Sequence, residues 1–218
     1  MSALALALLL AQTPPPPPVD VKALGKAALK ELVESGAEAR VLKVGAQAPD
    51  FTLPDAQGRP VKLSTLLAKG PVVVTFYRGA WCPYCNVQLG QYQERLKDLQ
   101  AAGAQLVAIS PQLPDFTAQT AKKHGLGFPV LSDRGNAVAR TYGLVYKMPD
   151  ALAQAYKEVY GIDLEIIHGD THHELPMPGT FVLDAKGIVR LAFAQADYTR
   201  RLTVEDLLVA VKGLAKTR

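Results

Sequence analysis

The chain holds two cysteines, Cys82 and Cys85, separated by Pro83 and Tyr84. A C-x-x-C segment supports either reversible dithiol and disulfide chemistry or metal binding. Side chains three residues apart on a helix lie roughly 5–6 Å from each other, which suits the Cα separation of about 4.4–6.8 Å found in disulfides. The spacing favours a redox pair, and we expect an intramolecular Cys82–Cys85 disulfide on oxidation.

The residues around the pair predict a strand, a sharp turn and a helix. Residues 72–76 form a continuous β-branched and aromatic run, which is typical of a strand buried on both faces. Residues 78–80 interrupt it, and Pro83 suits the first helical position because the N–H that it lacks would have no partner there. Cys82 is therefore expected at or near the N-cap. Apolar residues continue at helical spacing: Leu89, Tyr92, Leu96 and Leu99.

The N-cap position favours Cys82 as the nucleophile. The free N–H groups of Tyr84 and Cys85, together with the positive helix end, can face the Cys82 sulfur and stabilise its thiolate. Cysteines in such places titrate at roughly 3.5–7.5 instead of about 8.5. We expect Cys82 to meet solvent and attack, whereas Cys85 is shielded by Trp81 and the sheet and resolves the intermediate.

Other side chains of this segment are expected to shape the site. Trp81 packs beside the pair and shields it, and Tyr84 lies at the mouth. Arg78 also lies there, either as a cation that favours the thiolate or as a solvated loop residue. We assign no chemical step to these side chains.

Five segments occur in the order of a known family. They are G-A-Q-A-P-D-F-T-L at 45–53, F-Y-R-G-A-W-C-P-Y-C at 76–85, V-A-I-S-P at 107–111, F-P-V-L-S-D at 128–133 and P-G-T-F-V-L-D at 178–184. From residue 44 to about residue 213, the chain resembles the peroxiredoxin-like branch of the thioredoxin superfamily, the alkyl hydroperoxide reductase and thiol-specific antioxidant (AhpC/TSA) group.

The resemblance implies an α/β thioredoxin-like fold, with a central mixed sheet flanked by helices on both faces. It implies a thiol oxidoreductase that reduces hydroperoxides or disulfides. Electrons would come from a thioredoxin-like or glutaredoxin-like protein or a small thiol, and no flavin or nicotinamide cofactor is expected. Relatives often form homodimers, so a homodimer is one expected state.

The chain departs from the family pattern Pro-x-x-x-Thr-x-x-Cys. Arg78 takes the place of the Pro, Cys82 that of the Thr and Cys85 that of the attacking Cys. The alignment therefore assigns attack to Cys85, whereas the N-cap argument assigns it to Cys82. A bulky disulfide needs an accessible sulfur, but a small peroxide can reach a recessed one, so both assignments stay open.

A second departure lies at Pro178, which stands where the family has a distal Arg. By resemblance to thioredoxins, Pro178 is expected to face the dithiol after a cis Met177–Pro178 bond. Thr180 belongs to the same Pro-Gly-Thr-Phe segment and is expected to help shape the site. These features resemble a thioredoxin centre on a peroxiredoxin frame.

A polar cluster, His168, His172, His173 and Glu174, precedes Pro178. We expect a solvated loop and no metal site, although cysteine and histidine spacing leaves zinc binding as an alternative. An intermediate hypothesis is that His173 tunes a thiol. A zinc-binding or redox-silent interaction module remains the alternative to the enzyme.

Elsewhere the pattern alternates strands with helices, which predicts a mostly parallel sheet that a late hairpin makes mixed. Expected strands are 51–53, 61–63, 106–109, 130–132, 181–183 and 188–193. Expected helices are 21–35, a short helix capped by Ser64 and ending at Gly70, 114–124, 136–142, 148–160 and a final helix capped by Thr203.

The 218 residues carry 24 basic and 20 acidic side chains, without a dense basic block, so nucleic acid is not an expected partner. With 49% hydrophobic residues the chain can bury one substantial core. We expect a disordered segment at 1–20, a helical extension at 21–43 and a redoxin domain at 44–218.

The apolar run at residues 3–11 is too short to span a bilayer, which needs about 20 residues. No Lys or Arg precedes it, which favours a cytoplasmic protein over an exported one. The small residues at its end and the prolines at 14–18 suit a signal peptide and spacer, so export to the periplasm stays the alternative.

Overall fold

The computed structural model describes residues 19–215. The apolar run at 3–11 and the prolines at 14–18, on which the question of export depends, lie outside the described residues. The division into segments 1–20, 21–43 and 44–218 stays a prediction. No helix in the described range is both long and apolar enough to cross a membrane.

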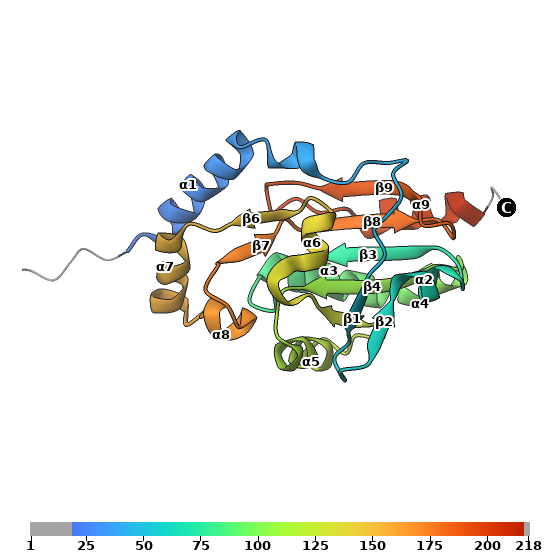
Figure 1. Ribbon diagram of the computed structural model, residues 1–218, viewed down its shortest axis with the longest axis horizontal. Helices are drawn as coiled ribbons and strands as arrows, with labels where there is room; N and C mark the ends of the chain where they lie inside the picture. Colours follow the sequence, from blue (N-terminus) through green and yellow to red (C-terminus); the bar gives the residue numbers. More distant parts are fainter. Residues whose placement is uncertain (1–18, 216–218) are drawn as a thin grey trace, which may run out of the picture.

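A five-stranded sheet forms the centre of the molecule (Figure 1). β3, β4 and β5 run parallel, whereas β8 is antiparallel to both β3 and β9. In spatial order the strands are β5 (Val130–Ser132), β4 (Gln105–Ser110), β3 (Val72–Phe76), β8 (Gly179–Leu183) and β9 (Val189–Ala194). The predicted thioredoxin-like mixed sheet is confirmed, and it is less parallel than the alternating pattern alone suggested.

The central strand β3 is buried along its whole length, as its apolar run predicts. Val74 and Phe76 join the core on one face of the sheet, and Val73 joins the core on the other. The hairpin between β8 and β9 closes on Asp184, whose Oδ1 accepts hydrogen bonds from the N–H groups of Lys186 and Ile188 at 2.9 Å each. The sequence therefore predicted both the strand and this turn.

Helices α3 (Pro83–Glu94), α4 (Leu96–Ala101) and α9 (Val204–Ala215) pack on one face of the sheet. The apolar spacing from Leu89 to Leu99 continues across a break between α3 and α4 at Arg95, where φ is −103° and ψ is 12°. Thr203 caps α9 as predicted, because its Oγ1 accepts from the Asp206 N–H at 3.1 Å.

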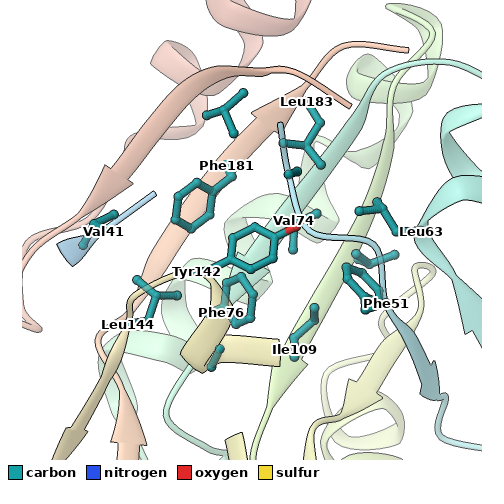
Figure 2. Close-up of a cluster of buried hydrophobic side chains, with 14 of the residues drawn as sticks. Val41, Phe51, Leu63, Val74, Phe76, Ile109, Tyr142, Leu144, Phe181 and Leu183 are labelled. Atoms are coloured by element: carbon teal, nitrogen blue, oxygen red, sulfur yellow. The ribbon is translucent and has the colours of Figure 1, made fainter. Parts of the chain in front are cut away.

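On the opposite face, three rings form the centre of a second core (Figure 2). Tyr142 lies between Phe76 and Phe181, with ring centroids 4.9 and 5.1 Å away. The layer that covers these rings consists of β1 (Thr52–Pro54), β2 (Pro60–Lys62), α2 (Leu63–Leu67) and α6 (Ala137–Thr141). Such buried aromatic contacts fix β3 and β8 side by side.

The prediction that Ser64 caps α2 is wrong. Lys62 is the N-cap residue and Ser64 lies inside the helix. The Ser64 N–H instead donates to Oδ1 of Asp50 at 2.9 Å, so a carboxylate from the preceding loop satisfies the helix start.

A third cluster holds the N-terminal helix on the body of the molecule. α1 (Val21–Glu34) packs against α7 (Asp150–Tyr160), close to the predicted ranges (Figure 1). Short elements that the sequence did not predict complete this region: η1 (Ala37–Arg40), β6 (Val145–Lys147), α8 (Leu164–His168) and β7 (Glu174–Pro176). The remaining elements of the described residues are α5 (Pro114–Lys123) and η2 (Arg134–Asn136).

Candidate active site

The turn between β3 and α3 carries the two cysteines. Cys82 is the N-cap residue of α3, with φ −88° and ψ 111°, and Pro83 occupies the first turn. The N–H groups of Cys85 and Asn86 donate to the Cys82 carbonyl at 3.1 Å each. The predicted placement of the pair at the helix start is therefore confirmed.

Both cysteines are free thiols, and both are buried. The exposed fraction is 1% for Cys82 and 0% for Cys85, so the prediction that Cys82 meets bulk solvent is wrong. Its access route is a cavity of about 320 Å³ that Cys82 lines together with Trp81 and Tyr84. In the described part of the chain, Cys85 does not line this cavity.

The two thiols have pKa values that shift in opposite directions. A hydrogen bond from the Cys85 thiol, opposed by burial, lowers the pKa of Cys82 to about 6, and Arg78 contributes further. Burial is the main cause that raises the pKa of Cys85, and its contact with Cys82 adds to this effect. These opposite shifts favour the thiolate on Cys82.

The cause of this low pKa differs from the one that the sequence suggested. The Cys85 N–H contributes to the lowered pKa of Cys82, but less than the Cys85 thiol and Arg78 do. The reason is geometric, because the Cys85 and Asn86 N–H groups point at the Cys82 carbonyl. The Cys82 side chain makes no capping hydrogen bond.

Arg78 is buried, with an exposed fraction of 3%, so the alternative of a solvated loop residue is wrong. Its guanidinium carbon lies 4.7 Å from the centre of the Trp81 ring and 4.4 Å from that of Tyr198. Stacking between two aromatic rings holds a permanent positive charge beside Cys82. The alternative of a cation that favours the thiolate fits this position.

A second arginine approaches the pair from the loop between β9 and α9. Nη2 of Arg201 donates to Sγ of Cys85 at 3.5 Å. No sequence motif pointed to Arg201, because it lies more than a hundred residues beyond the cysteines. Arg201 therefore supplies a cation beside the cysteine pair, although Pro178 occupies the position where the family has its distal Arg.

Buried side chains from neighbouring elements fix the shape of the turn. The Ala80 N–H donates to Oε1 of Gln112 at 2.6 Å, and Nδ2 of Asn86 donates to the Ala80 carbonyl at 2.7 Å. Gln112 follows the carboxyl end of β4, which is parallel to β3, so strand adjacency could have identified it. Gly79 has φ +149°, and a Cβ there would collide with the Trp81 ring.

Thr180 lies behind the pair in a buried hydroxyl network. Its Oγ1 is 2.9 Å from Oγ1 of Thr75 and 3.2 Å from the hydroxyl of Tyr92. Nε2 of Gln88, from the same helix as Cys85, donates to that Tyr92 hydroxyl at 2.9 Å. This network ties α3 to β3 and β8, so Thr180 positions the helix that carries the cysteines.

The prediction of a cis Met177–Pro178 bond is wrong, because the peptide bonds of the described residues contain no cis bond. The segment is held in another way. The Met177 N–H donates to the Leu144 carbonyl at 2.8 Å, which continues the pairing of β6 and β7 up to the start of β8. Pro178 is buried, and the thioredoxin-like role that the sequence suggested for it is not supported.

The histidines do not join the dithiol. Nδ1 of His173 pairs with Asp150 at 2.9 Å and Nε2 lies 3.4 Å from Glu165, so the hypothesis that His173 tunes a thiol is not supported. His168 is buried in α8. Across the described residues, no group of three or more His, Cys, Asp or Glu is arranged to hold a metal ion.

The aromatic wall of the cavity was not predicted beyond Trp81 and Tyr84. Tyr156 and Tyr160 come from α7, and Tyr198 comes from the loop that leads to α9. Periodicity placed the two tyrosines on a helix, but only the packing of α7 against Trp81 brings them to the cysteines.

Comparison with known proteins agrees with this geometry. A family model described as "AhpC/TSA family" matches residues 44–192. This chain belongs to the AhpC/TSA family. Chloroplastic peroxiredoxin Q of Sedum lineare is 34% identical over 155 residues, which cover 71% of this chain and 70% of that protein. A putative peroxiredoxin of Mycobacterium tuberculosis is 33% identical over 151 residues, which cover 69% and 84%.

Solved structures show the same fold. Peroxidoxin BcpB from Mycobacterium tuberculosis superposes with a TM-score of 0.62 at 25% identity, over 79% of this chain and 98% of that one. Peroxiredoxin Q from Xanthomonas campestris gives 0.59 at 22%, over 81% and 98%. As a member of the AhpC/TSA family, the chain is a peroxiredoxin, a thiol-dependent peroxidase, and it is similar to peroxiredoxin Q. Membership implies a peroxide substrate and a thioredoxin-type reductant.

Proposed function

We propose that Cys82 and Cys85 of the C-P-Y-C segment reduce hydroperoxides, with Cys82 as the nucleophile and Cys85 as the resolving thiol. The Cys82 thiolate attacks the terminal oxygen of the hydroperoxide, the O–O bond breaks, and an alcohol leaves after protonation by water. The resulting sulfenic acid condenses with the Cys85 thiol, which forms the disulfide and releases water. Two electrons from a thiol donor restore both cysteines.

The observation that carries this assignment is the asymmetry between the two sulfurs. Cys82 lines the cavity and has a pKa lowered to about 6, mainly by the hydrogen bond from Cys85. Cys85 has a raised pKa and lies behind it. A thiolate on the cavity wall can react, whereas a buried neutral thiol next to it is suited to resolution.

The competing assignment makes Cys85 the peroxidatic residue, in line with the family pattern. The hydrogen bond from Arg201 to the Cys85 sulfur favours it, because a cation beside a thiol stabilises the thiolate. The net effect of the surroundings nevertheless raises the Cys85 pKa. We therefore place Arg201 as a residue that stabilises charge transiently on Cys85 when the disulfide is reduced.

The reductant we propose is a dithiol protein of the thioredoxin type. Tyr84 and Val87 are exposed on the outer side of α3, with exposed fractions of 45% and 61%. This apolar area beside the pair offers a docking surface for a protein, which a small thiol would not need. Reduction by thioredoxin should exceed reduction by glutathione at equal thiol concentration.

The substrate class is tested by mixing reduced protein with hydrogen peroxide, cumene hydroperoxide and an oxidised protein such as insulin. Trp81 is the single tryptophan and lies next to Cys82, so its fluorescence reports oxidation. The hydroperoxides should oxidise the protein faster than insulin does, and peptide mapping should find the Cys82–Cys85 disulfide within one chain. Faster reaction with insulin, or mostly covalent dimers, would contradict the proposal.

We also propose that the enzyme acts in the cytoplasm, where thioredoxin and glutathione keep cysteine pairs reduced. Fractionation of the native cells should recover the protein together with cytoplasmic proteins. Recovery with exported proteins would contradict this proposal.

A further inference from the structure

The buried guanidinium of Arg78 has no polar partner among the described residues. No ion pair or hydrogen bond involves its side chain there, and its Nε is buried without an acceptor. Its contacts are the faces of Trp81 and Tyr198. An unpaired buried cation is costly, so a site that retains one usually offers it to an anion.

Arg78 lies on the wall of the cavity that also holds Cys82. In the described part of the chain, the other lining residues include no Asp, Glu or Lys; they are Trp81, Cys82, Pro83, Tyr84, Tyr156, Tyr160, Ile162 and Tyr198. Apart from the Cys82 thiolate, Arg78 is therefore the one charged group among the described residues that line this cavity. Its planar fork matches a carboxylate.

The remaining wall is largely aromatic. The Trp81 and Tyr156 rings are 5.8 Å apart, as are those of Tyr156 and Tyr160, and Tyr84 lies 6.0 Å from Tyr198. With Arg78 between Trp81 and Tyr198, these side chains form one continuous series around the cavity. Flat apolar walls of this kind favour stacking with an aromatic ligand.

The size of the cavity also points to an organic substrate. Its volume of about 320 Å³ lies at the lower end of small-molecule sites, which hold roughly 300–1,000 Å³. Hydrogen peroxide has only two heavy atoms and would leave most of this space unused. A single substituted ring with a carboxylate at one end and a hydroperoxide at the other is of the right size.

We propose that this cavity selects aromatic hydroperoxides that carry a carboxylate. The carboxylate pairs with Arg78, the ring lies against the tyrosines and Trp81, and the peroxide is presented to Cys82. The substrate class rests on the proposed function. The binding preference rests only on Arg78 and the aromatic wall, so the two can fail separately.

Binding is measured first, without turnover. The probes are para-carboxylated cumyl alcohol, which is the product of the corresponding hydroperoxide, and its neutral methyl ester, titrated into reduced protein and followed by Trp81 fluorescence. One buried charge-assisted hydrogen-bonded pair predicts that the acid binds about tenfold to a hundredfold more tightly than the ester. Equal affinities would overturn the proposal, and this comparison needs no variant.

Variants assign the preference to a residue. Arg78→Gln should abolish the difference between acid and ester, whereas Arg200→Gln removes an exposed charge from the loop beside Tyr198 and should preserve it. If both variants reduce the difference equally, the selectivity comes from net charge and the proposed contact is wrong. If Arg78 serves only the Cys82 thiolate, the wild type binds acid and ester with equal affinity, and Arg78→Gln slows the reduction of every peroxide alike. This outcome would overturn the proposal.

Turnover separates this proposal from the function on which it rests. The wild type should reduce carboxylated cumene hydroperoxide with a kcat/KM above that of its methyl ester, by the same factor as in binding. Reduction of hydrogen peroxide without any preference for the acid would leave the peroxidase standing and overturn the ligand assignment. Selective binding of the acid by a protein that reduces no peroxide would overturn the peroxidase alone.

Discussion

At the residue scale, the chemistry depends on how two adjacent thiols share one proton. Because the Cys85 thiol donates to the Cys82 sulfur, the first proton leaves Cys82 and the second is retained on Cys85. Arg78 adds a cation beside Cys82 that the aromatic stacking keeps in place. In the proposed assignment the nucleophile is therefore selected by its neighbours, and the helix start contributes less than its position suggests.

Substitution of Cys85 tests this dependence. Cys85→Ala removes the donor and should raise the pKa of Cys82 above about 6, whereas Cys85→Ser keeps a hydroxyl donor and should raise it less. A lowered pKa means that thiolate is lost as the pH falls through it, so the peroxide rate should decline below about pH 6 in the wild type. Thiolate absorbance against pH measures each midpoint. A wild-type midpoint near the ordinary value of about 8.5 would contradict this picture.

At the element scale, the segment after β4, helix α3 and a glycine within the turn fix the turn that carries the site. Gln112 beyond β4 accepts from the Ala80 N–H, Asn86 in α3 donates to the Ala80 carbonyl, and Gly79 lets the chain pass close to Trp81. A side chain at residue 79 would have to occupy the space of the indole ring and the Gln112 amide. The position of Trp81 therefore depends on this glycine.

Gly79→Ala should destabilise the protein, because it combines strained backbone with a collision. We expect a loss of at least about 1–3 kcal/mol in the free energy of unfolding and slower peroxide reduction. Gly90→Ala is the matched control, since Gly90 lies in α3 with open space around its Cα, and it should stabilise by about 0.5–1 kcal/mol. Urea unfolding followed by fluorescence compares them. Similar effects of both substitutions would show that the turn does not need glycine.

The elements around the cysteines were predictable because the signal there is local. A buried apolar run, a break and Pro83 define β3, the turn and α3 within twenty residues, and the hairpin at Asp184 is equally local. The partners of the site were not predictable in this way. Tyr156 and Arg201 reach the cysteines only after α7 and the last loop have packed.

The local sequence pattern also did not predict that Cys82 and Arg78 are buried. A residue at a helix start is usually accessible, and Arg78 follows a strand where a solvated side chain is common. Here the α7 region and the loop carrying Tyr198 cover both residues, so Cys82 reaches outside only through the cavity. The prediction of a cis Met177–Pro178 bond was wrong for a similar reason, because a shared Pro-Gly-Thr-Phe segment does not fix the geometry of the preceding peptide bond.

At the scale of the whole molecule, two hydrophobic cores lie on opposite faces of the sheet. A third hydrophobic cluster lies among α1, α7 and α8. The cavity beside Cys82 is lined by α7 of this third region and by the first residues of α3. The integrity of the site should therefore depend on the helical region as well as on the redoxin core. The stability of this region should depend on pH through His168, which is buried in α8 with its Nε2 unpaired among the described residues.

The stability of this region should fall in mild acid. Burial lowers the pKa of His168 from 6.5 to about 4, so the folded protein resists protonation that the unfolded chain accepts. The neutral form contributes stability above pH 6.5, and about 3 kcal/mol is lost as the pH falls to 4. His168→Gln should flatten this part of the stability profile measured by urea unfolding, whereas the exposed His172→Gln should not. A wild-type profile that is flat between pH 6.5 and 4 would count against the burial of a neutral imidazole.

The sulfur that first becomes a sulfenic acid decides the central assignment. Reduced Cys85→Ser and Cys82→Ser proteins are each mixed with one equivalent of hydrogen peroxide in the presence of dimedone, and the adduct is located by mass spectrometry, with the double variant as the blank. We predict a rapid adduct at Cys82 in Cys85→Ser and slow reaction of Cys82→Ser. Fast peroxide consumption by Cys82→Ser, with the adduct at Cys85, would contradict the assignment and make Cys85 the peroxidatic residue.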